Sequence, residues 1–171
     1  GLPASTGKAV VIGASANPRK LSYGILRNLV LSGYQGGIYP VNPTAAEILG
    51  KPAWADISGV PDPVELAEIV LPVPAIPAAL EACGKRGVKA VVVISGGFKE
   101  VGADGEQMEQ RCLEIIRHYG MRMIGPNCVG LMNLHAGLNT TFIYGQPDIG
   151  GISFLAQSGA AMGGVVDTML G

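Results

Sequence analysis

Charged residues are scarce in this chain, because Asp, Glu, Lys and Arg make up only 15% of its 171 residues and the formal net charge is −1. The sequence contains no cluster of Lys and Arg. Proteins that bind nucleic acid or an anionic membrane need a positive field, so neither partner is expected. A small-molecule ligand is favoured instead. The low content of charged residues is consistent with a chain whose surface is partly covered by another domain or by a subunit of an oligomer.

Cysteines are few and long apolar runs are missing. Cys83, Cys112 and Cys128 lie far apart and form no Cys-x-x-Cys or Cys/His pattern, which argues against a disulfide framework and a zinc site. No apolar run approaches the roughly 20 residues that span a bilayer, and residues 1–8 lack the pattern of a secretory signal. We therefore expect a soluble cytoplasmic protein without a metal site.

Short apolar runs alternate with helical patterns along the chain. The runs cover 9–12, 66–71, 90–94, 121–124 and 152–155, and a further strand is expected at 37–41, before two closely spaced prolines. Most runs are rich in Val and Ile, as is typical of strands buried on both faces of a parallel sheet. Between them lie three sets of residues at helical spacing: Leu21, Ile25, Leu26 and Leu29; Ile76, Leu80 and Cys83; and Met108, Cys112, Ile115, Ile116 and Tyr119. This order predicts an α/β fold with a doubly wound, mostly parallel, Rossmann-like sheet.

Local signals refine this prediction. Asp104 and Gln107 have the spacing of a capping box at the start of the third helix, and Gly120 stands where a left-handed residue would end it. Residues 145–151 have the composition of a connector. We therefore expect one domain over 1–146, and a connector with the first strand and helix of a second, flavodoxin-like α/β domain over 147–171.

The first loop, at residues 13–19, is the best candidate for a phosphate site. Ligands of an open parallel sheet bind beyond the carboxyl ends of its strands. Gly13 permits a tight turn, Ser15 and Asn17 offer polar groups, Arg19 offers a cation, and Gly24 is expected to let the helix approach its neighbours closely. The loop does not match Gly-x-Gly-x-x-Gly, and no acidic residue ends the second strand, so NAD is disfavoured.

Two later loops end at the same edge of the predicted sheet, at 95–100 and 125–130. Cys128 lies in the second of them, but no histidine pattern supports an activated thiolate there. His118 fits a helix-terminal role, and His135 has no carboxylate nearby in the sequence. The residues themselves therefore indicate no catalytic group.

Five motifs, in order, resemble the CoA-binding domain of NDP-forming acyl-CoA synthetases. They are Val-Val-Ile-Gly-Ala-Ser, Ile-Tyr-Pro-Val-Asn-Pro, Val-Ile-Ser-Gly-Gly-Phe, Gly-Met-Arg-Met-Ile-Gly-Pro-Asn-Cys-Val-Gly and Ile-Ser-Phe-Leu-Ala-Gln-Ser-Gly-Ala. The resemblance implies that coenzyme A contacts Gly13, Ala14, Ser15, Ala16, Asn17, Arg19, Val41, Asn42, Ser95 and Gly96. It also implies that Asn127, Ser158 and Gly159 belong to a phosphate or acyl region. Thr44 departs from the pattern, because ADP-forming relatives often have Lys there; Arg19 or Lys20 is then the expected source of positive charge.

In this family acyl-CoA and phosphate give acyl phosphate and CoA, and a phosphohistidine carries the phosphoryl group to a nucleoside diphosphate. The resemblance places the NDP/NTP and Mg²⁺ on a separate ATP-grasp domain or subunit, and neither His118 nor His135 matches the phosphohistidine motif. The leading hypothesis is the CoA-binding part of such a synthetase, inactive as this chain alone. The alternatives are a CoA- or acyl-CoA-sensing domain of a protein acetyltransferase and an NAD(P)-binding oxidoreductase domain.

Overall fold

The computed structural model describes residues 7–61 and 63–170. Its main sheet has five strands in the order β2-β1-β5-β6-β7, and every neighbouring pair is parallel. The strands are β1 (Lys8–Ile12), β2 (Gly37–Val41), β5 (Leu66–Ile69), β6 (Ala90–Val93) and β7 (Arg122–Ile124). The predicted doubly wound α/β fold is confirmed, and each of these strands falls on a predicted run.

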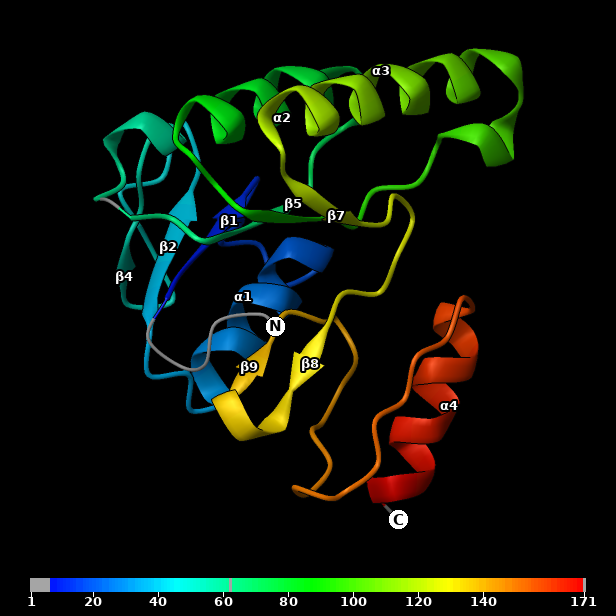
Figure 1. Ribbon diagram of the computed structural model, residues 1–171. Helices are drawn as coiled ribbons and strands as arrows, with labels where there is room; N and C mark the ends of the chain where they lie inside the picture. The colour runs from blue at the N-terminus through cyan, green and yellow to red at the C-terminus, as the bar shows by residue number, and fades with distance from the viewer. Residues whose placement is uncertain (1–6, 62, 171) are drawn as a thin grey trace.

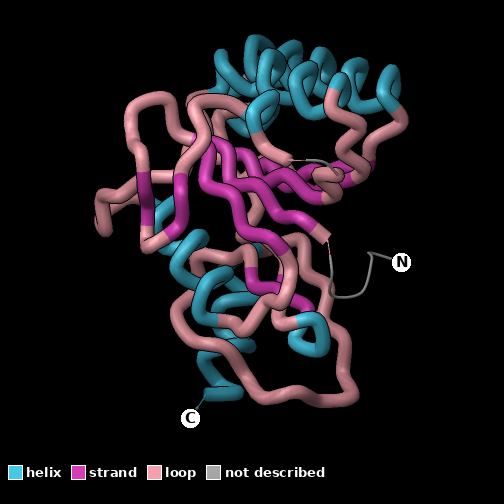
Figure 2. Tube along the Cα trace, turned by 90° about the vertical axis from the view of Figure 1, so that its left-hand side faces the viewer, coloured by secondary structure: helices cyan, strands magenta, loops and turns pink. Residues whose placement is uncertain are grey.

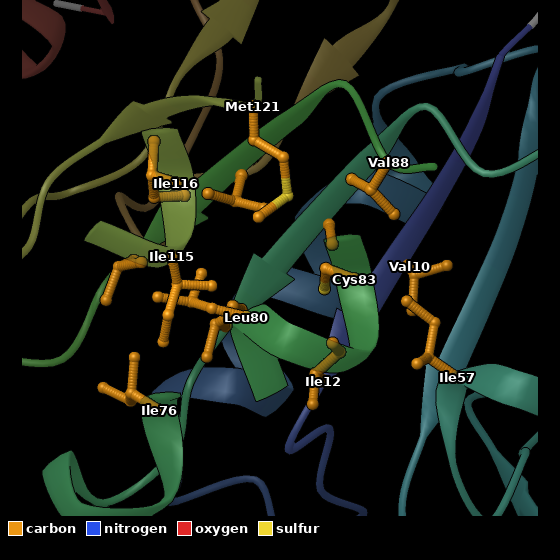
Figure 3. Packing of buried hydrophobic residues seen from close by; sticks show 14 of the residues in the cluster. Val10, Ile12, Ile57, Ile76, Leu80, Cys83, Val88, Ile115, Ile116 and Met121 are labelled. Carbon is orange, nitrogen blue, oxygen red and sulfur yellow. The ribbon is translucent and has the colours of Figure 1, made fainter. Parts of the chain in front are cut away.

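Helices cover both faces of the sheet (Figure 1). On one face lie α2 (Ile76–Lys85) and α3 (Ala103–Tyr119), and on the other lies α1 (Leu21–Leu31). Alternate residues of β1 separate the two cores, because Val10 packs towards α2 and α3 while Val11 packs towards α1. Figure 3 shows the first of these cores, where Leu80 of α2 lies beside Ile115 of α3, and to which Cys83 and Ile116 also belong.

Two small antiparallel pairs flank the sheet (Figure 2). The pair β3 (Glu47–Ile48) and β4 (Lys51–Pro52) lies beside the edge strand β2, and the pair β8 (Met132–Asn133) and β9 (Leu138–Asn139) lies on the α1 side. We call residues 128–142, which contain β8 and β9, the crossing segment. Cys128, Leu131, Leu138 and Phe142 of this segment pack into the core between the sheet and α1.

The predicted strand at 152–155 is wrong. These residues have no regular secondary structure, and the side chains of Ile152 and Leu155 are 84% and 97% exposed. A strand needs a neighbour for its backbone hydrogen bonds, and none of the described residues pairs with this run. The helix expected after it is present as α4 (Gly159–Leu170). The division of the chain at residue 147 stays a prediction.

Two local predictions also need correction. The chain enters α3 from Gly102, whose φ is 115°, so Asp104 falls inside the first helical turn and caps no amide with its side chain. A Cβ on Gly24 would meet nothing within 4 Å, so no close helix contact requires a glycine there. Gly120, with a φ of 63°, ends α3 in the left-handed conformation as predicted.

Candidate functional site

The strand order defines where a ligand would sit. From β1 the chain moves to β2 on one side and then returns to β5 on the other side, so the strand order reverses between β1 and β5. Loops leaving these two strands diverge at such a point and leave a crevice beyond the carboxyl ends. The first predicted loop, at residues 13–19, lies within the segment 13–20 that joins β1 to α1 at this reversal.

Loop 13–20 is held by its own polar groups. The Ser15 hydroxyl accepts the N–H of Asn17 at 3.1 Å, and the Asn17 side-chain oxygen accepts the N–H of Arg19 at 3.0 Å. Gly13 has a φ of 87°, and a Cβ there would lie 2.2 Å from the carbonyl oxygen of Val70. Glycine is therefore required at this position both by its conformation and by the close approach of the chain that follows β5.

Asn42 joins the loop to the end of β2. Its Nδ2 donates to the carbonyl oxygen of Ala14 at 2.8 Å, and its Oδ1 accepts the N–H groups of Thr44 and Ala45, both at 2.9 Å. The N–H groups of Gly13 and Ala14 both point to the carbonyl of Val41, at 3.1 and 3.2 Å. Val41 and Asn42 thus support the loop from the neighbouring strand.

Further contacts continue along the same edge. The Ser95 hydroxyl donates to the carbonyl of Leu71 at 2.6 Å, and the N–H of Asn127 donates to the carbonyl of Ser95 at 2.9 Å. A Cβ on Gly96 would lie 3.0 Å from Oδ1 of Asn127, so the loops after β6 and β7 are in close contact. The edge therefore brings together all ten predicted CoA-contacting residues and Asn127.

The start of α1 fits a phosphate group. No side chain caps this end of the helix, its first turn carries no acidic residue, and Arg19 and Lys20 are exposed just before it. Helix amino ends carry partial positive charge and unsatisfied N–H groups, which attract phosphate oxygens. The residues present are therefore suited to the phosphate groups of a nucleotide or of coenzyme A.

Comparison with known proteins shows the family of the chain. Residues 8–133 match the family model described as a CoA binding domain. The chain belongs to the CoA-binding domain family. Among curated proteins, the alpha subunit of ADP-forming acetate–CoA ligase II from Pyrococcus furiosus is 47% identical over 157 residues, and ADP-forming acetate–CoA ligase of Methanocaldococcus jannaschii is 43% identical over 157 residues.

Solved structures agree with this membership of the CoA-binding domain family. PH0766 from Pyrococcus horikoshii OT3 has a TM-score of 0.92 and 42% identity over 97% of this chain. The dinucleotide-forming acetyl-coenzyme A synthetase 1 of Candidatus Korarchaeum cryptofilum, solved with phosphate and ADP, has a TM-score of 0.92 and 40% identity over 96% of this chain.

These relatives are much longer than the region matched. The match covers 91% and 92% of this chain but 34% and 22% of the two curated proteins, and 38% and 35% of the two solved chains. The chain thus spans between 22% and 38% of their length.

Ser158 and Gly159 lie near the carboxyl edge of the sheet of this CoA-binding domain, whereas His118 does not. Ser158 caps α4, accepting the N–H of Ala161 at 3.3 Å, and a Cβ on Gly159 would lie 2.2 Å from Val129 in the loop after β7. The amino end of α4 is therefore next to the loop that contains Asn127. His118 lies in the last turn of α3, which leads towards the start of β7, at the opposite edge of the sheet.

The thiol of Cys128 is not an activated nucleophile. Its Sγ donates to the carbonyl of Val93 at 3.3 Å, and burial raises its pKa to about 11. Thr44 donates its hydroxyl to Oδ1 of Asn42 at 3.1 Å and so helps to orient that amide. Among the described residues, no group of three or more His, Cys, Asp or Glu could hold a metal ion, and no helix is long and apolar enough to cross a membrane.

Sequence reasoning missed the loop after β5. Leu71 accepts the Ser95 hydroxyl, and the adjacent Val70 carbonyl is the group that a Cβ on Gly13 would meet. This loop therefore links the β1 loop to the β6 loop at the reversal of strand order. The rule that ligands bind beyond strand ends could have identified it, because Val70 directly follows a buried strand.

Proposed function

We propose that this chain is the CoA-binding part of an ADP-forming acyl-CoA synthetase and that coenzyme A binds across the loops at the carboxyl edge of its sheet. The observation that carries this proposal is the continuous set of contacts from Asn42 through loop 13–20 and Leu71 to Ser95 and Asn127. A family model for CoA binding covers the same region. The four relatives described above include ligases and synthetases that act with CoA.

In this proposal different residues of the chain bind different parts of one extended CoA molecule. The amino end of α1, with Arg19 and Lys20, holds the phosphate groups, because its N–H groups and cations attract anions. Ser15 and Asn17 fix the shape of that loop, and Asn42 holds it against β2. Ser95 and Gly96 line the far part of CoA, and Asn127, Ser158 and Gly159 border a neighbouring phosphate or acyl region, beside Val129.

The whole reaction would be acyl-CoA, phosphate and NDP giving carboxylate, CoA and NTP. We propose that the phosphohistidine and the site for the nucleotide and Mg²⁺ lie outside this chain, on the remainder of a second domain and on an ATP-grasp domain or subunit. Within this chain no described acid, base or nucleophile lies at the edge in an activated form, so the chain alone is expected to bind without turnover. A cytoplasmic location and assembly into an oligomer belong to the same proposal.

Isothermal titration calorimetry with CoA and with NAD tests the choice of ligand. Binding of CoA with no heat from NAD is expected, and the reverse result would overturn the proposal. The only tryptophan, Trp54, gives an independent signal, because its carbonyl accepts the N–H of Asn42 at 2.8 Å. Fluorescence of Trp54 should therefore change when CoA binds.

Ser15→Asp tests the place of the ligand. An aspartate can still accept the N–H of Asn17, so the loop should keep its shape, while the new charge repels the CoA phosphates. We expect a rise in Kd of about tenfold or more, which corresponds to roughly 1.4 kcal/mol. The matched control is Ser15→Asn, because asparagine has the size of aspartate and an acceptor oxygen but no charge. This variant should bind CoA as the unmodified chain does. Equal Kd values for the two variants would place CoA elsewhere.

A further inference from the structure

A carboxyl group lies at the centre of the sheet, where charged groups are rarely found. Glu68 belongs to β5, the middle strand, and its side chain is 1% exposed. Its register partners on the two neighbouring strands are Val11 and Val92. Both valines pack into the core on the α1 side of the sheet. The side chain of Glu68 is therefore enclosed by the neighbouring strands β1 and β6 and by the residues that cover the α1 side of the sheet.

Neither carboxyl oxygen of Glu68 has a hydrogen-bonding partner among the described residues. The Thr140 hydroxyl, on the crossing segment, lies near enough to lower the pKa of Glu68 in part. Its well-formed hydrogen bonds, however, are to the backbone of Leu131, at 3.2 Å to the carbonyl and 3.3 Å to the N–H, so it does not fully satisfy the carboxyl. Moving an unpaired carboxylate from water into the protein interior costs roughly several kcal/mol, whereas moving the neutral carboxylic acid costs much less. The buried group is therefore stable only with its proton.

Among the described residues, no cation is recorded as acting on this carboxyl. From the crossing segment its titratable neighbour is Cys128, whose pKa is itself raised by burial and by Glu68, whereas His135 of the same segment is exposed. From α1 the apolar residues Ile25, Leu26 and Leu29 pack into this core, and the buried Ser22, at helical spacing from them, carries a neutral hydroxyl. Asn28 donates to the carbonyls of Thr141 and Ile143, and the Arg27 guanidinium lies 5.1 Å from the ring centre of Tyr144.

We propose that Glu68 is a pH-dependent latch: the protonated side chain allows the crossing segment to pack on the sheet, and loss of the proton to solvent loosens that segment. The crossing segment begins inside the loop after β7, whose Asn127 contacts Ser95. Loosening it would therefore disturb one side of the edge described above. The latch is a property of the chain without any ligand, so its failure would leave the proposal of CoA binding untouched.

The direction of the pH effect follows from the burial. Burial raises the pKa of Glu68 well above its ordinary value, and Thr140 offsets only part of that rise. Between the ordinary and the raised pKa the closed segment keeps a proton on Glu68, which the carboxyl releases when the segment opens and water reaches it. The free energy of opening the crossing segment therefore falls as the pH rises through this range, and the equilibrium constant for opening grows by up to about tenfold per pH unit.

Hydrogen exchange read by mass spectrometry tests the latch on the 171-residue chain, with exchange rates corrected for their intrinsic pH dependence. Peptides from 128–142 should lose protection as the pH rises from 5 to 9, while peptides from α2 and α3 should not. Glu68→Gln keeps the size of the side chain but cannot ionise, so it should abolish the pH-dependent part of the loss. The matched control is Glu65→Gln, which neutralises a half-buried carboxyl just before β5 and should behave as the unmodified chain does.

The latch would be overturned if protection of peptides from 128–142 fell with pH as steeply in Glu68→Gln as in the unmodified chain. A loss of protection spread evenly over all peptides would overturn it as well. If Glu68→Gln fails to fold, the side-chain carboxyl can be titrated in the unmodified chain by ¹³C NMR. Titration near pH 4.3, the ordinary value for Glu, would also overturn the proposal.

Discussion

Gly13 and Gly24 lie on either side of the β1 loop and have opposite surroundings. Gly13→Ala places a methyl group 2.2 Å from the Val70 carbonyl at a φ of 87°, so it should lower the free energy of unfolding by about 2 kcal/mol or more. Gly24→Ala adds a methyl group to a helix where nothing lies within 4 Å, and should raise the free energy of unfolding by about 0.5–1 kcal/mol. Urea unfolding of the two variants measures both effects. Shifts of the same sign would contradict this interpretation of the loop.

The same pair shows what single residues reveal before a structure is known. The sequence correctly marks Gly13 as a turn, because a glycine directly after a buried strand has few other uses. It gives no signal that the contact is with Val70, which is far along the chain and approaches only through the sheet. Glu68 is a further example, because the residues around it in the sequence are those of an ordinary buried strand.

At the scale of elements, Asn42 connects two loops that leave different strands. Asn42→Asp removes the donor to the Ala14 carbonyl and places a negative charge beside it, while the bonds from Thr44 and Ala45 can persist. Loss of one buried partner costs about 1–3 kcal/mol, so we expect a lower free energy of unfolding by that amount and weaker CoA binding. The control is Asn133→Asp, because Oδ1 of Asn133 accepts the N–H of Ala136 at 3.2 Å and an aspartate can replace it. Equal stability of the two variants would show that the tie to Ala14 is unimportant.

The sequence predicts elements well where burial of apolar side chains determines them, and poorly where they depend on a neighbouring strand. The three central strands, β1, β5 and β6, are buried almost throughout and rich in apolar residues, so composition alone identifies them. The run at 152–155 is equally apolar, but no described strand lies beside it and it stays irregular. The start of α3 was misplaced because the φ of Gly102, which sets it, leaves no mark in the spacing of Asp104 and Gln107. The site residues on the first loop were brought together as expected, while the β5 loop was missed because its contacts form only in the assembled sheet.

At the scale of the whole molecule, the candidate site and the C-terminal part depend on different contacts. All ten residues assigned to CoA contacts lie between 13 and 96, on loops fixed by the sheet. Among residues 147–170 only Val166 is buried, and α4 meets the rest through Gly159 beside Val129 and Leu170 beside Gly145. The sheet should therefore fold and bind its ligand without α4.

Removal of residues 147–171 tests this separation and the predicted boundary together. The chain 1–146 keeps both cores and the crossing segment, so its urea midpoint and its Kd for CoA should match those of the full chain within about twofold. A chain ending at Ala136 is the matched control, because it loses the buried residues Leu138, Asn139, Thr140 and Thr141 and should not fold cooperatively. If chain 1–146 also loses cooperative unfolding, α4 and the sheet are one unit. If it folds but binds CoA much more weakly, Ser158 and Gly159 hold part of the ligand and the site extends across the boundary.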